Sequence, residues 1–278
     1  MVNRTATRSR RPNSGFCGIG RGLALAALFG ACAVPPLPRA DKVLPLPGEA
    51  FSLAGREAFL LLPKVRAHEG PLPWVLYAPT LPGLPSAAEQ WLFERLLASG
   101  VAIAGIDVGE SYGNAAGCAR YDELHRHLTT VRGLSARPVL LGRSRGGLMT
   151  LAWAVDRPER VAAFAGIYPV CDLRSYRGLA KAAPAYGMDA AGLAAELAQH
   201  NPIDRLAALA AARVPCFAVH GDRDVVVPFE ANSGALAERL RAGGGSVEIE
   251  MLPGRGHDMD LGFFRSERLL AFVLRHAR

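Results

Sequence analysis

Two serines of this chain lie in the pattern Gly-x-Ser-x-Gly, which can present a hydroxyl nucleophile at a sharp turn. Ser111 lies in GESYG (109–113), and Ser144 lies in GRSRGG (142–147). A nucleophile turn needs a strand before it and a helix directly after it, because the helix N-terminus must face the developing negative charge. Ser144 lies between the apolar run PVLL and the amphipathic run LMTLAWAV, whereas loop-forming residues follow Ser111. We therefore predict that Ser144 is the nucleophile and that Ser111 belongs to a loop.

An acid and a base that could activate this serine follow later in the chain. HGDRDVVVP places Asp224 after an apolar run, and GRGHDMD places His257 after the next one. Asp222 is the alternative acid, although its position is typical of a turn residue. In this scheme His257 takes the proton of Ser144 as the hydroxyl attacks a carbonyl, and the acid fixes the tautomer of the imidazole. The order of residues predicts a triad of Ser144, Asp224 and His257.

The elements that must position these residues are visible as apolar runs without polar alternation. Such runs are typical of parallel strands that are covered on both faces. We expect strands at 73–78, 101–107, 138–141, 161–170, 216–221 and 247–252, and helices at 87–99, 121–131, 146–155, 203–212, 232–242 and 267–276. This alternation predicts an α/β fold with an open, doubly wound sheet. The stretch 171–201 is longer than a usual connection and has its own helical pattern, so we expect a small cap insertion there.

Together, GRSRGG, HGDRDVVVP and GRGHD resemble the α/β-hydrolases over essentially all of the chain after residue 33. They look in particular like the prolyl-oligopeptidase-like and dienelactone-hydrolase-like members of that family. In the family the acid follows the nucleophile by two strands and the histidine follows it by three. The resemblance implies an α/β-hydrolase fold, with an eight-stranded, mostly parallel sheet and helices on both faces. It also implies hydrolysis of an acyl bond through an acyl-enzyme.

The same resemblance implies an oxyanion hole built from backbone N–H groups. One donor is expected at Arg145, directly after the nucleophile, and the other in the loop after the strand at 73–78. The chain reads Ala-Pro-Thr at 78–80. Because Pro79 has no N–H, Thr80 is the predicted second donor.

The arginines on either side of Ser144 are candidate substrate-binding residues. A cation in the first turn of a helix opposes the helix dipole by about 0.3 to 1 kcal/mol, so Arg145 needs compensation. A salt bridge to Glu110 or Asp107 would provide it. Alternatively, Arg145 or Arg143 binds an anionic part of the substrate or the oxyanion itself. Pocket lining and ordinary packing are both open for Tyr112, Glu110 and the cap residues Tyr176, Tyr186 and Met188.

Residues 1–33 have the layout of an export signal. Five arginines and no acidic residue accompany an apolar run that is too short to span a bilayer, and Ala-Cys-Ala at 31–33 fits a cleavage site. We therefore expect a signal peptide at 1–33, a catalytic domain at 34–278, and a periplasmic or extracellular location without a stable membrane span. Attachment of a lipid to Cys32 is the alternative.

Composition excludes several other classes of protein. The five N-terminal arginines account for most of the formal net charge of +7, so the remaining chain has no basic stripe suited to nucleic acid. Three cysteines remain after residue 33, too few for a disulfide scaffold, and no histidines have the spacing of metal ligands. We expect no nucleic-acid partner, no metal and no cofactor.

Three functions are compatible with these features. The first is an exported serine esterase that acts on a small-molecule or carbohydrate-linked ester. The second is a serine peptidase of the prolyl-oligopeptidase type, although the stretch between residue 33 and the strand at 73–78 is too short for the propeller of such peptidases. The third is a binding protein on a hydrolase scaffold. We would expect such a protein to lack a triad member, and none is missing.

Overall fold

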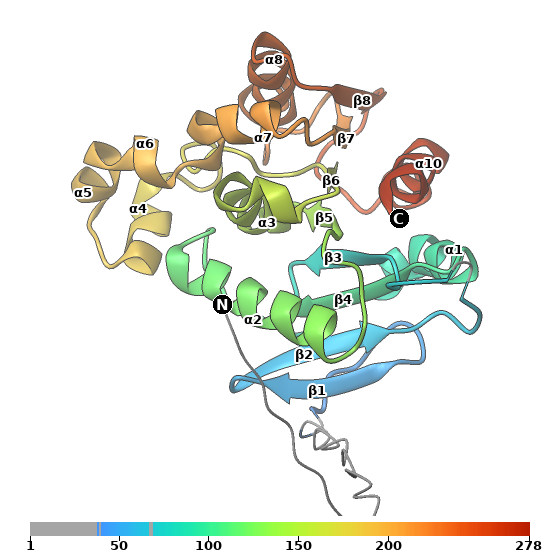
Figure 1. The fold of residues 1–278 in the computed structure, drawn as a ribbon. Coiled ribbons are helices and arrows are strands. Elements are labelled where there is room, and N and C mark those ends of the chain that lie inside the picture. Colours follow the sequence, from blue (N-terminus) through green and yellow to red (C-terminus); the bar gives the residue numbers. More distant parts are fainter. Residues whose placement is uncertain (1–37, 39, 67–68) are drawn as a thin grey trace, which may run out of the picture. The chain divides into compact units, whose positions relative to one another are not determined.

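An eight-stranded sheet is the centre of the computed structural model, which describes residue 38 and residues 40–66 and 69–278 (Figure 1). The expected signal peptide and Cys32 lie outside the described residues. The strands, in spatial order, are β1 (Glu49–Leu53), β2 (Arg56–Leu61), β4 (Ala102–Ile106), β3 (Trp74–Ala78), β5 (Val139–Arg143), β6 (Ala163–Ile167), β7 (Cys216–Gly221) and β8 (Val247–Leu252). β2 pairs antiparallel with β1 and β4, and all other neighbours are parallel. The expected mostly parallel α/β-hydrolase sheet is confirmed.

Each of the six apolar runs coincides with one of the strands β3 to β8, although β5 extends two residues beyond the predicted 138–141. Every residue of β3, β4 and β6 is buried, as the absence of polar alternation predicted. β1 and β2 were not predicted from the apolar runs. They form a hairpin around Ala54 and Gly55, and β1 lies at the edge of the sheet with a single buried residue, Phe51. An edge strand with so little burial has no continuous apolar pattern.

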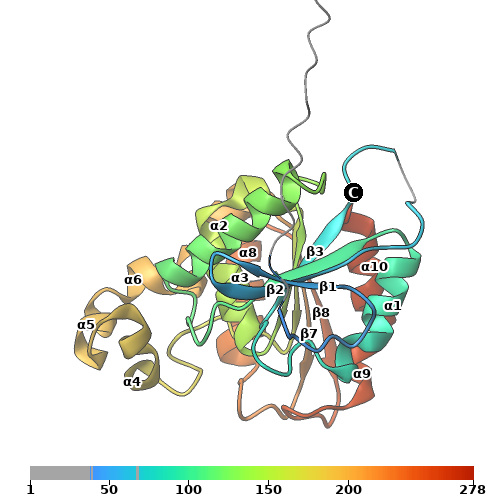
Figure 2. The same cartoon turned by 90° about the horizontal axis from the view of Figure 1, so that it is seen from below.

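Helices cover both faces of the sheet (Figures 1 and 2). Buried side chains of α2, α3, α7 and α8 share one apolar core with the sheet, and those of α1, α9 and α10 share a second core on the other face. The bounds on the first face are α2 (Ala115–Thr130), α3 (Arg145–Asp156), α7 (Ala207–Ala211) and α8 (Ala235–Ala242), and those on the second are α1 (Gln90–Ala98), α9 (Leu261–Phe264) and α10 (Glu267–His276). No helix among the described residues is long and apolar enough to cross a bilayer.

The expected insertion at 171–201 contains the short helices α4 (Leu179–Ala182), α5 (Ala190–Ala195) and α6 (Leu197–His200). It has its own apolar cluster, against which Tyr186 and Met188 pack and in which Tyr176 is buried. The hydroxyl of Tyr186 donates to the carbonyl of Tyr112 over 2.8 Å, which ties the insertion to the loop before α2. Ordinary packing therefore accounts for these cap residues.

Candidate functional site

Ser144 lies at the turn between β5 and α3. Its φ of 49° and ψ of −123° place it in a region that L-residues rarely adopt. The backbone around it is held on both sides, because its N–H donates to the carbonyl of Ile167 and its own carbonyl accepts from Gly147, both over 2.9 Å. This is the strand, tight turn and helix that a nucleophile elbow requires.

The two glycines of the turn are needed because strand and helix approach closely. A Cβ added to Gly142 would lie 2.6 Å from Cα of Gly147, and one added to Gly146 would lie 2.1 Å from the carbonyl oxygen of Ala78. Both contacts are with backbone atoms, which cannot rotate away. Any side chain at either position would push α3 off the sheet.

The three predicted triad residues form one hydrogen-bonded chain. Nε2 of His257 lies 2.9 Å from Oγ of Ser144, and Nδ1 of His257 lies 2.8 Å from Oδ2 of Asp224. Asp224 follows β7 and His257 follows β8, so all three meet at the carboxyl edge of the parallel strands. Since a carboxylate can only accept, Nδ1 carries a proton and Nε2 is free to accept from the serine hydroxyl.

Asp224 is held as a carboxylate by several donors. Burial alone would raise its pKa, but hydrogen bonds from His220 and His257 and from the N–H of Val227 outweigh burial and hold the pKa well below its ordinary value of 3.8. The N–H groups of Val226 and Val227 donate to Oδ1 over 3.0 and 2.8 Å. The alternative acid, Asp222, instead accepts the N–H of Gly254 over 2.6 Å and belongs to a turn.

His220 is a further buried residue of the same motif and was not among the predicted site residues. Its Nε2 lies 2.8 Å from the carbonyl oxygen of Val227, and its Nδ1 lies 2.8 Å from Oγ of Ser233. A carbonyl only accepts, so Nε2 carries the proton and Nδ1 accepts from the hydroxyl of Ser233. The imidazole thus braces the loop that carries Asp224.

A buried ion pair lies beneath the nucleophile. Nη1 of Arg143 donates to Oε1 of Glu89 over 2.7 Å, and the hydroxyl of Tyr77 donates to the same oxygen over 2.8 Å. The other oxygen accepts the N–H and the hydroxyl of Ser86. Glu89 has no exposed surface and was not among the predicted site residues. The signal available for it was the capping box Ser-Ala-Ala-Glu at 86–89, which marks a helix start but no partner.

A cavity of about 160 Å³ opens beside Ser144. It is lined by Pro79, Leu84, Arg143, Ser144, Arg145, Tyr168, His257, Asp258 and Met259. Tyr168, which was not among the predicted site residues, packs against His257 with ring centroids 4.3 Å apart and ring planes tilted by 54°. Burial raises the pKa of Tyr168 to about 12, so its hydroxyl keeps its proton at neutral pH. Neither the insertion nor Tyr112 contributes to this lining.

The two predicted oxyanion donors, Arg145 and Thr80, have different surroundings in the structure. The N–H of Arg145 lies in the first turn of α3, where helix N–H groups have no intrahelical acceptor. Thr80 has no exposed surface, and its hydroxyl donates to the carbonyl of Tyr77 over 3.2 Å. Its neighbour Pro79 lines the cavity in its place. The structure thus brings Arg145 to Ser144, but does not bring Thr80 there.

The charge of Arg145 is compensated by an ion pair with Glu110. Of the two partners considered from the sequence, Asp107 is used otherwise, because its Oδ1 accepts the N–H of Gly109 over 2.7 Å. Ser111 is almost wholly buried, and its hydroxyl accepts the N–H of Gly113 in the turn before α2. The second Gly-x-Ser-x-Gly pattern is therefore a loop, as predicted.

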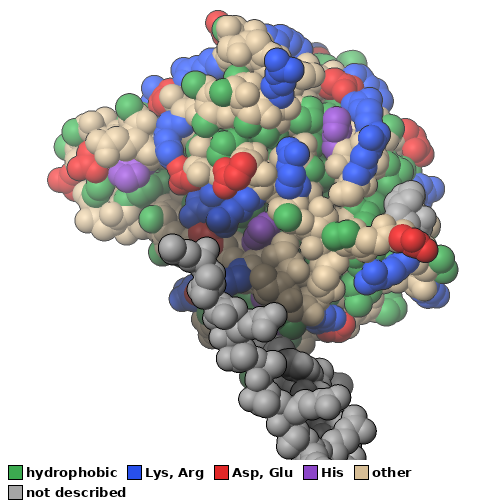
Figure 3. All heavy atoms as spheres, viewed as in Figure 1, with side chains coloured by type: hydrophobic (Ala, Val, Ile, Leu, Met, Phe, Trp, Pro, Cys, Tyr) green, Lys and Arg blue, Asp and Glu red, His purple; other side chains and the backbone are tan. Residues whose placement is uncertain are grey.

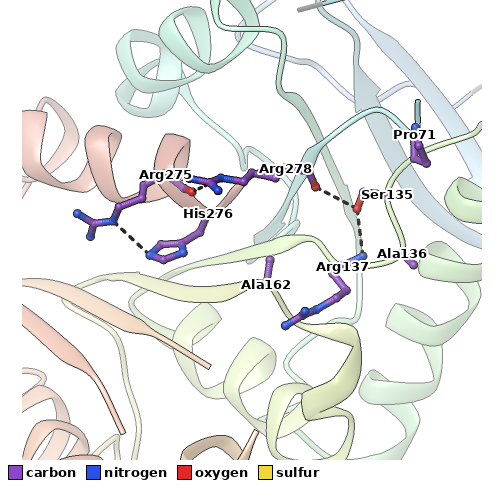
Figure 4. A pocket seen from close by; sticks show the side chains of 8 residues that line it. All are labelled: Pro71, Ser135, Ala136, Arg137, Ala162, Arg275, His276 and Arg278. Atoms are coloured by element: carbon purple, nitrogen blue, oxygen red, sulfur yellow. Dashed lines mark hydrogen bonds between the residues drawn. The ribbon is translucent and has the colours of Figure 1, made fainter. Parts of the chain in front are cut away.

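A larger cavity, of about 620 Å³, lies at the opposite edge of the sheet (Figure 4). Its lining includes Ser135 and Arg137, just before β5, and Arg275 at the end of α10. The guanidinium of Arg137 is bound to the carbonyl of Val161, and that of Arg275 forms an ion pair with Glu248. This cavity is remote from Ser144 and shares no residue with its site.

Within residues 38, 40–66 and 69–278, no cluster of three or more His, Cys, Asp or Glu side chains could hold a metal ion. Cys118, Cys171 and Cys216 are all buried and free.

A protein-family model described as the prolyl oligopeptidase family matches residues 133–278, more than half of the chain. The matched part contains the nucleophile turn and the two loops that carry Asp224 and His257. No curated protein sequence matches this chain.

Several solved structures share the fold. A puromycin-hydrolyzing peptidase of Mycobacterium tuberculosis is 18% identical with a TM-score of 0.65, over 83% of this chain and 40% of that one. The acylaminoacyl peptidase of Pyrococcus horikoshii is 13% identical with a TM-score of 0.63, over 83% of this chain and 41% of that one. Est1E from Butyrivibrio proteoclasticus is 17% identical with a TM-score of 0.58, over 82% of this chain and 98% of that one. The chain therefore spans about 40% of the length of these two peptidases.

Proposed function

Because this chain belongs to the prolyl oligopeptidase family of serine hydrolases, we propose that it hydrolyses esters of small or carbohydrate-linked substrates, with Ser144 as nucleophile. The observation that carries this proposal is the hydrogen-bonded chain from Ser144 through His257 to Asp224. In this mechanism Oγ of Ser144 attacks the ester carbonyl while Nε2 of His257 takes its proton. The imidazolium then returns that proton to the alcohol as the ester C–O bond breaks.

Asp224 stabilises the imidazolium through the bond to Nδ1 and remains ionised throughout. The N–H of Arg145 at the start of α3 stabilises the oxyanion, and the acyl-enzyme is hydrolysed by water that His257 activates. The hydroxyl of Tyr168 is a second candidate donor, since it belongs to the same cavity as Ser144. Thr80 would serve only if the loop at 78–80 rearranged to expose its N–H.

The preference for a small ester is supported by the size of the cavity. Its volume of about 160 Å³ is below the roughly 300–1,000 Å³ of pockets for drug-sized ligands, so a short acyl group would fill the space beside Ser144. The structural likeness to Est1E, over 98% of that chain, is consistent with a hydrolase of this size.

A peptidase is the second candidate. The likeness to the puromycin-hydrolyzing peptidase and the acylaminoacyl peptidase favours it. A non-catalytic binding protein is a poorer account of the site, because all three triad residues are present in hydrogen-bonding geometry.

For the location of this protein we propose export through residues 1–33, which N-terminal sequencing of the processed protein would test.

The proposal is tested with a short-chain p-nitrophenyl ester and a proline-containing chromogenic peptide. Each is offered to the wild type, Ser144→Ala and Ser111→Ala. We expect ester turnover that is lost in Ser144→Ala and largely kept in Ser111→Ala, without cleavage of the peptide. Peptide cleavage that depends on Ser144 would establish the peptidase instead. Ester turnover that survives in Ser144→Ala would refute the assignment of the nucleophile.

A further inference from the structure

A second cavity, of about 290 Å³, lies at the same edge of the sheet as Ser144. Its lining includes Arg56 at the start of β2 and Glu110 in the loop after β4. Because β2 runs antiparallel to β4, the start of β2 lies beside the carboxyl end of β4. Only β3 separates β4 from β5, so this edge is roughly two strand spacings, or about 10 Å, from the nucleophile turn.

One ion pair joins the two cavities. Arg145 lines the cavity of Ser144, Glu110 lines the second cavity, and their side chains are in direct contact. A substrate whose carbonyl lies at Ser144 would reach the second cavity by passing over this pair. The second cavity is therefore placed to bind a part of the substrate that does not react.

The second cavity carries an excess of positive charge. Arg120, which also lines it, is paired with Glu123 over 2.9 Å, and Glu110 is paired with Arg145. Arg56 forms no ion pair with any residue that the structure describes. Among the described residues, the positive charge of Arg56 thus has no ion-pair partner.

Two neutral polar side chains of the lining, those of Asn114 and Ser111, have hydrogen-bond partners within the protein. The side-chain amide of Asn114 is fully used, since its oxygen accepts from Gly117 and its nitrogen donates to the carbonyl of Ala185. The hydroxyl of Ser111 is almost wholly buried and accepts the N–H of Gly113 at 3.4 Å. The cavity therefore offers the guanidinium of Arg56, which suits an acceptor group with a single negative charge.

We propose that this cavity binds a carboxylate at the non-reacting end of the substrate, roughly 10 Å from the scissile carbonyl, with Arg56 as its ionic partner. The preferred substrates are then esters that bear a remote carboxylate, rather than neutral esters of the same length. This inference rests on the proposed ester hydrolysis at Ser144, whose substrate class it specifies.

The test uses two esters that share the scissile group and differ only at the remote end, which is a carboxylate in one and a carboxamide in the other. In Arg56→Gln we expect KM for the carboxylate ester to rise about two- to fivefold, the effect of losing one solvent-exposed ionic contact. The kcat for that ester and both constants for the carboxamide ester stay unchanged. Arg126→Gln is the matched control, because Arg126 is an exposed arginine of α2 without an ion pair among the described residues. It should alter neither ester.

Binding without turnover separates this inference from the proposed function. The two esters are titrated calorimetrically into Ser144→Ala, with and without Arg56→Gln. A preference for the carboxylate ester that disappears with Arg56→Gln supports the site, even if the wild type hydrolyses neither ester. Equal or undetectable binding of the two esters to Ser144→Ala overturns the carboxylate site, whereas Ser144-dependent turnover of both esters would leave the proposed function intact.

Discussion

Nε2 of His220 lies 3.5 Å from Oδ2 of Asp224, and both side chains are wholly buried. The same nitrogen also lies 2.8 Å from the carbonyl oxygen of Val227, whose N–H donates to Oδ1 of Asp224. His220 therefore acts on the triad acid twice, directly through its proton and indirectly by holding the loop that supplies the backbone donors.

His220→Gln should lower kcat by about ten- to a hundredfold, the range for losing a hydrogen bond to a charged group, with little change in KM. Ser233→Ala should have a smaller effect in the same direction, because it removes only the hydroxyl bonded to Nδ1 of His220. Both constants and the pH profile of kcat/KM are measured. His200→Gln is the control, since His200 lies in the insertion and is paired with Glu196. An unchanged kcat in His220→Gln would show that this contact only stabilises the fold.

Asp224→Asn should reduce kcat by about ten thousandfold, because the neutral amide no longer holds His257 in the required tautomer. Asp222→Asn should leave kcat within about threefold of the wild type, since Asp222 only accepts the N–H of Gly254. The kcat values of the two variants are compared by steady-state kinetics, after circular dichroism has shown that both are folded to the same extent. The reverse order of effects would make Asp222 the triad acid.

The depressed pKa of Asp224 predicts how stability responds to acid. Its folded pKa is below the ordinary 3.8, so its contribution to the free energy of unfolding is complete above that value. The contribution is lost as the pH falls through 3.8 toward the folded pKa, because the unfolded chain binds the proton first. Urea unfolding between about pH 6 and pH 3 should show the gap between wild type and Asp224→Asn narrowing as the pH falls. A difference in free energy of unfolding that stays constant with pH would contradict the lowered pKa of Asp224.

Glu89→Gln should destabilise the protein by about 3 kcal/mol or more, because it leaves the guanidinium of Arg143 without its charge partner in a largely buried site. The matched control is Glu49→Gln. Glu49 pairs with Arg132 at the surface, so its loss should cost at most about 1 kcal/mol. Urea unfolding of both variants gives the two values. Equal costs would mean that the buried pair contributes no more than an exposed one.

The three described cysteines should resist alkylation in the native protein. Burial raises the pKa of Cys118 and Cys216 to about 12, and raises that of Cys171 well above its ordinary value. Since the thiolate is the reactive form, only about one thiol in ten thousand is ionised at pH 8 for Cys118 and Cys216. Treatment with iodoacetamide followed by peptide mass mapping should find them labelled only after unfolding. Labelling of Cys171 in the native state would indicate local opening around the end of β6.

The sequence by itself predicted the strands β3 to β8 and the three residues that the structure joins by hydrogen bonds, Ser144, Asp224 and His257. Continuous apolar runs and a strand-turn-helix pattern are local, and parallel strands bring their carboxyl ends to one edge whatever the details of packing. Ser144, Asp224 and His257 could therefore be identified from their places after these strands. β1 was not predicted, because this edge strand buries a single residue and so has no continuous apolar run.

Only the tertiary structure decided which side chains meet across separate loops. Glu89 lies beneath Arg143 although 54 positions separate them, and no sequence pattern relates a helix cap to a residue at the end of β5. Arg145 could have paired with Asp107 or Glu110, and Asp107 was already used by its own turn. Thr80 was predicted at the oxyanion hole by counting along the chain, but the direction of its backbone depends on how the loop packs over β3. Local periodicity determines the strands, whereas such contacts depend on the packing of loops that the chain brings together only when it folds.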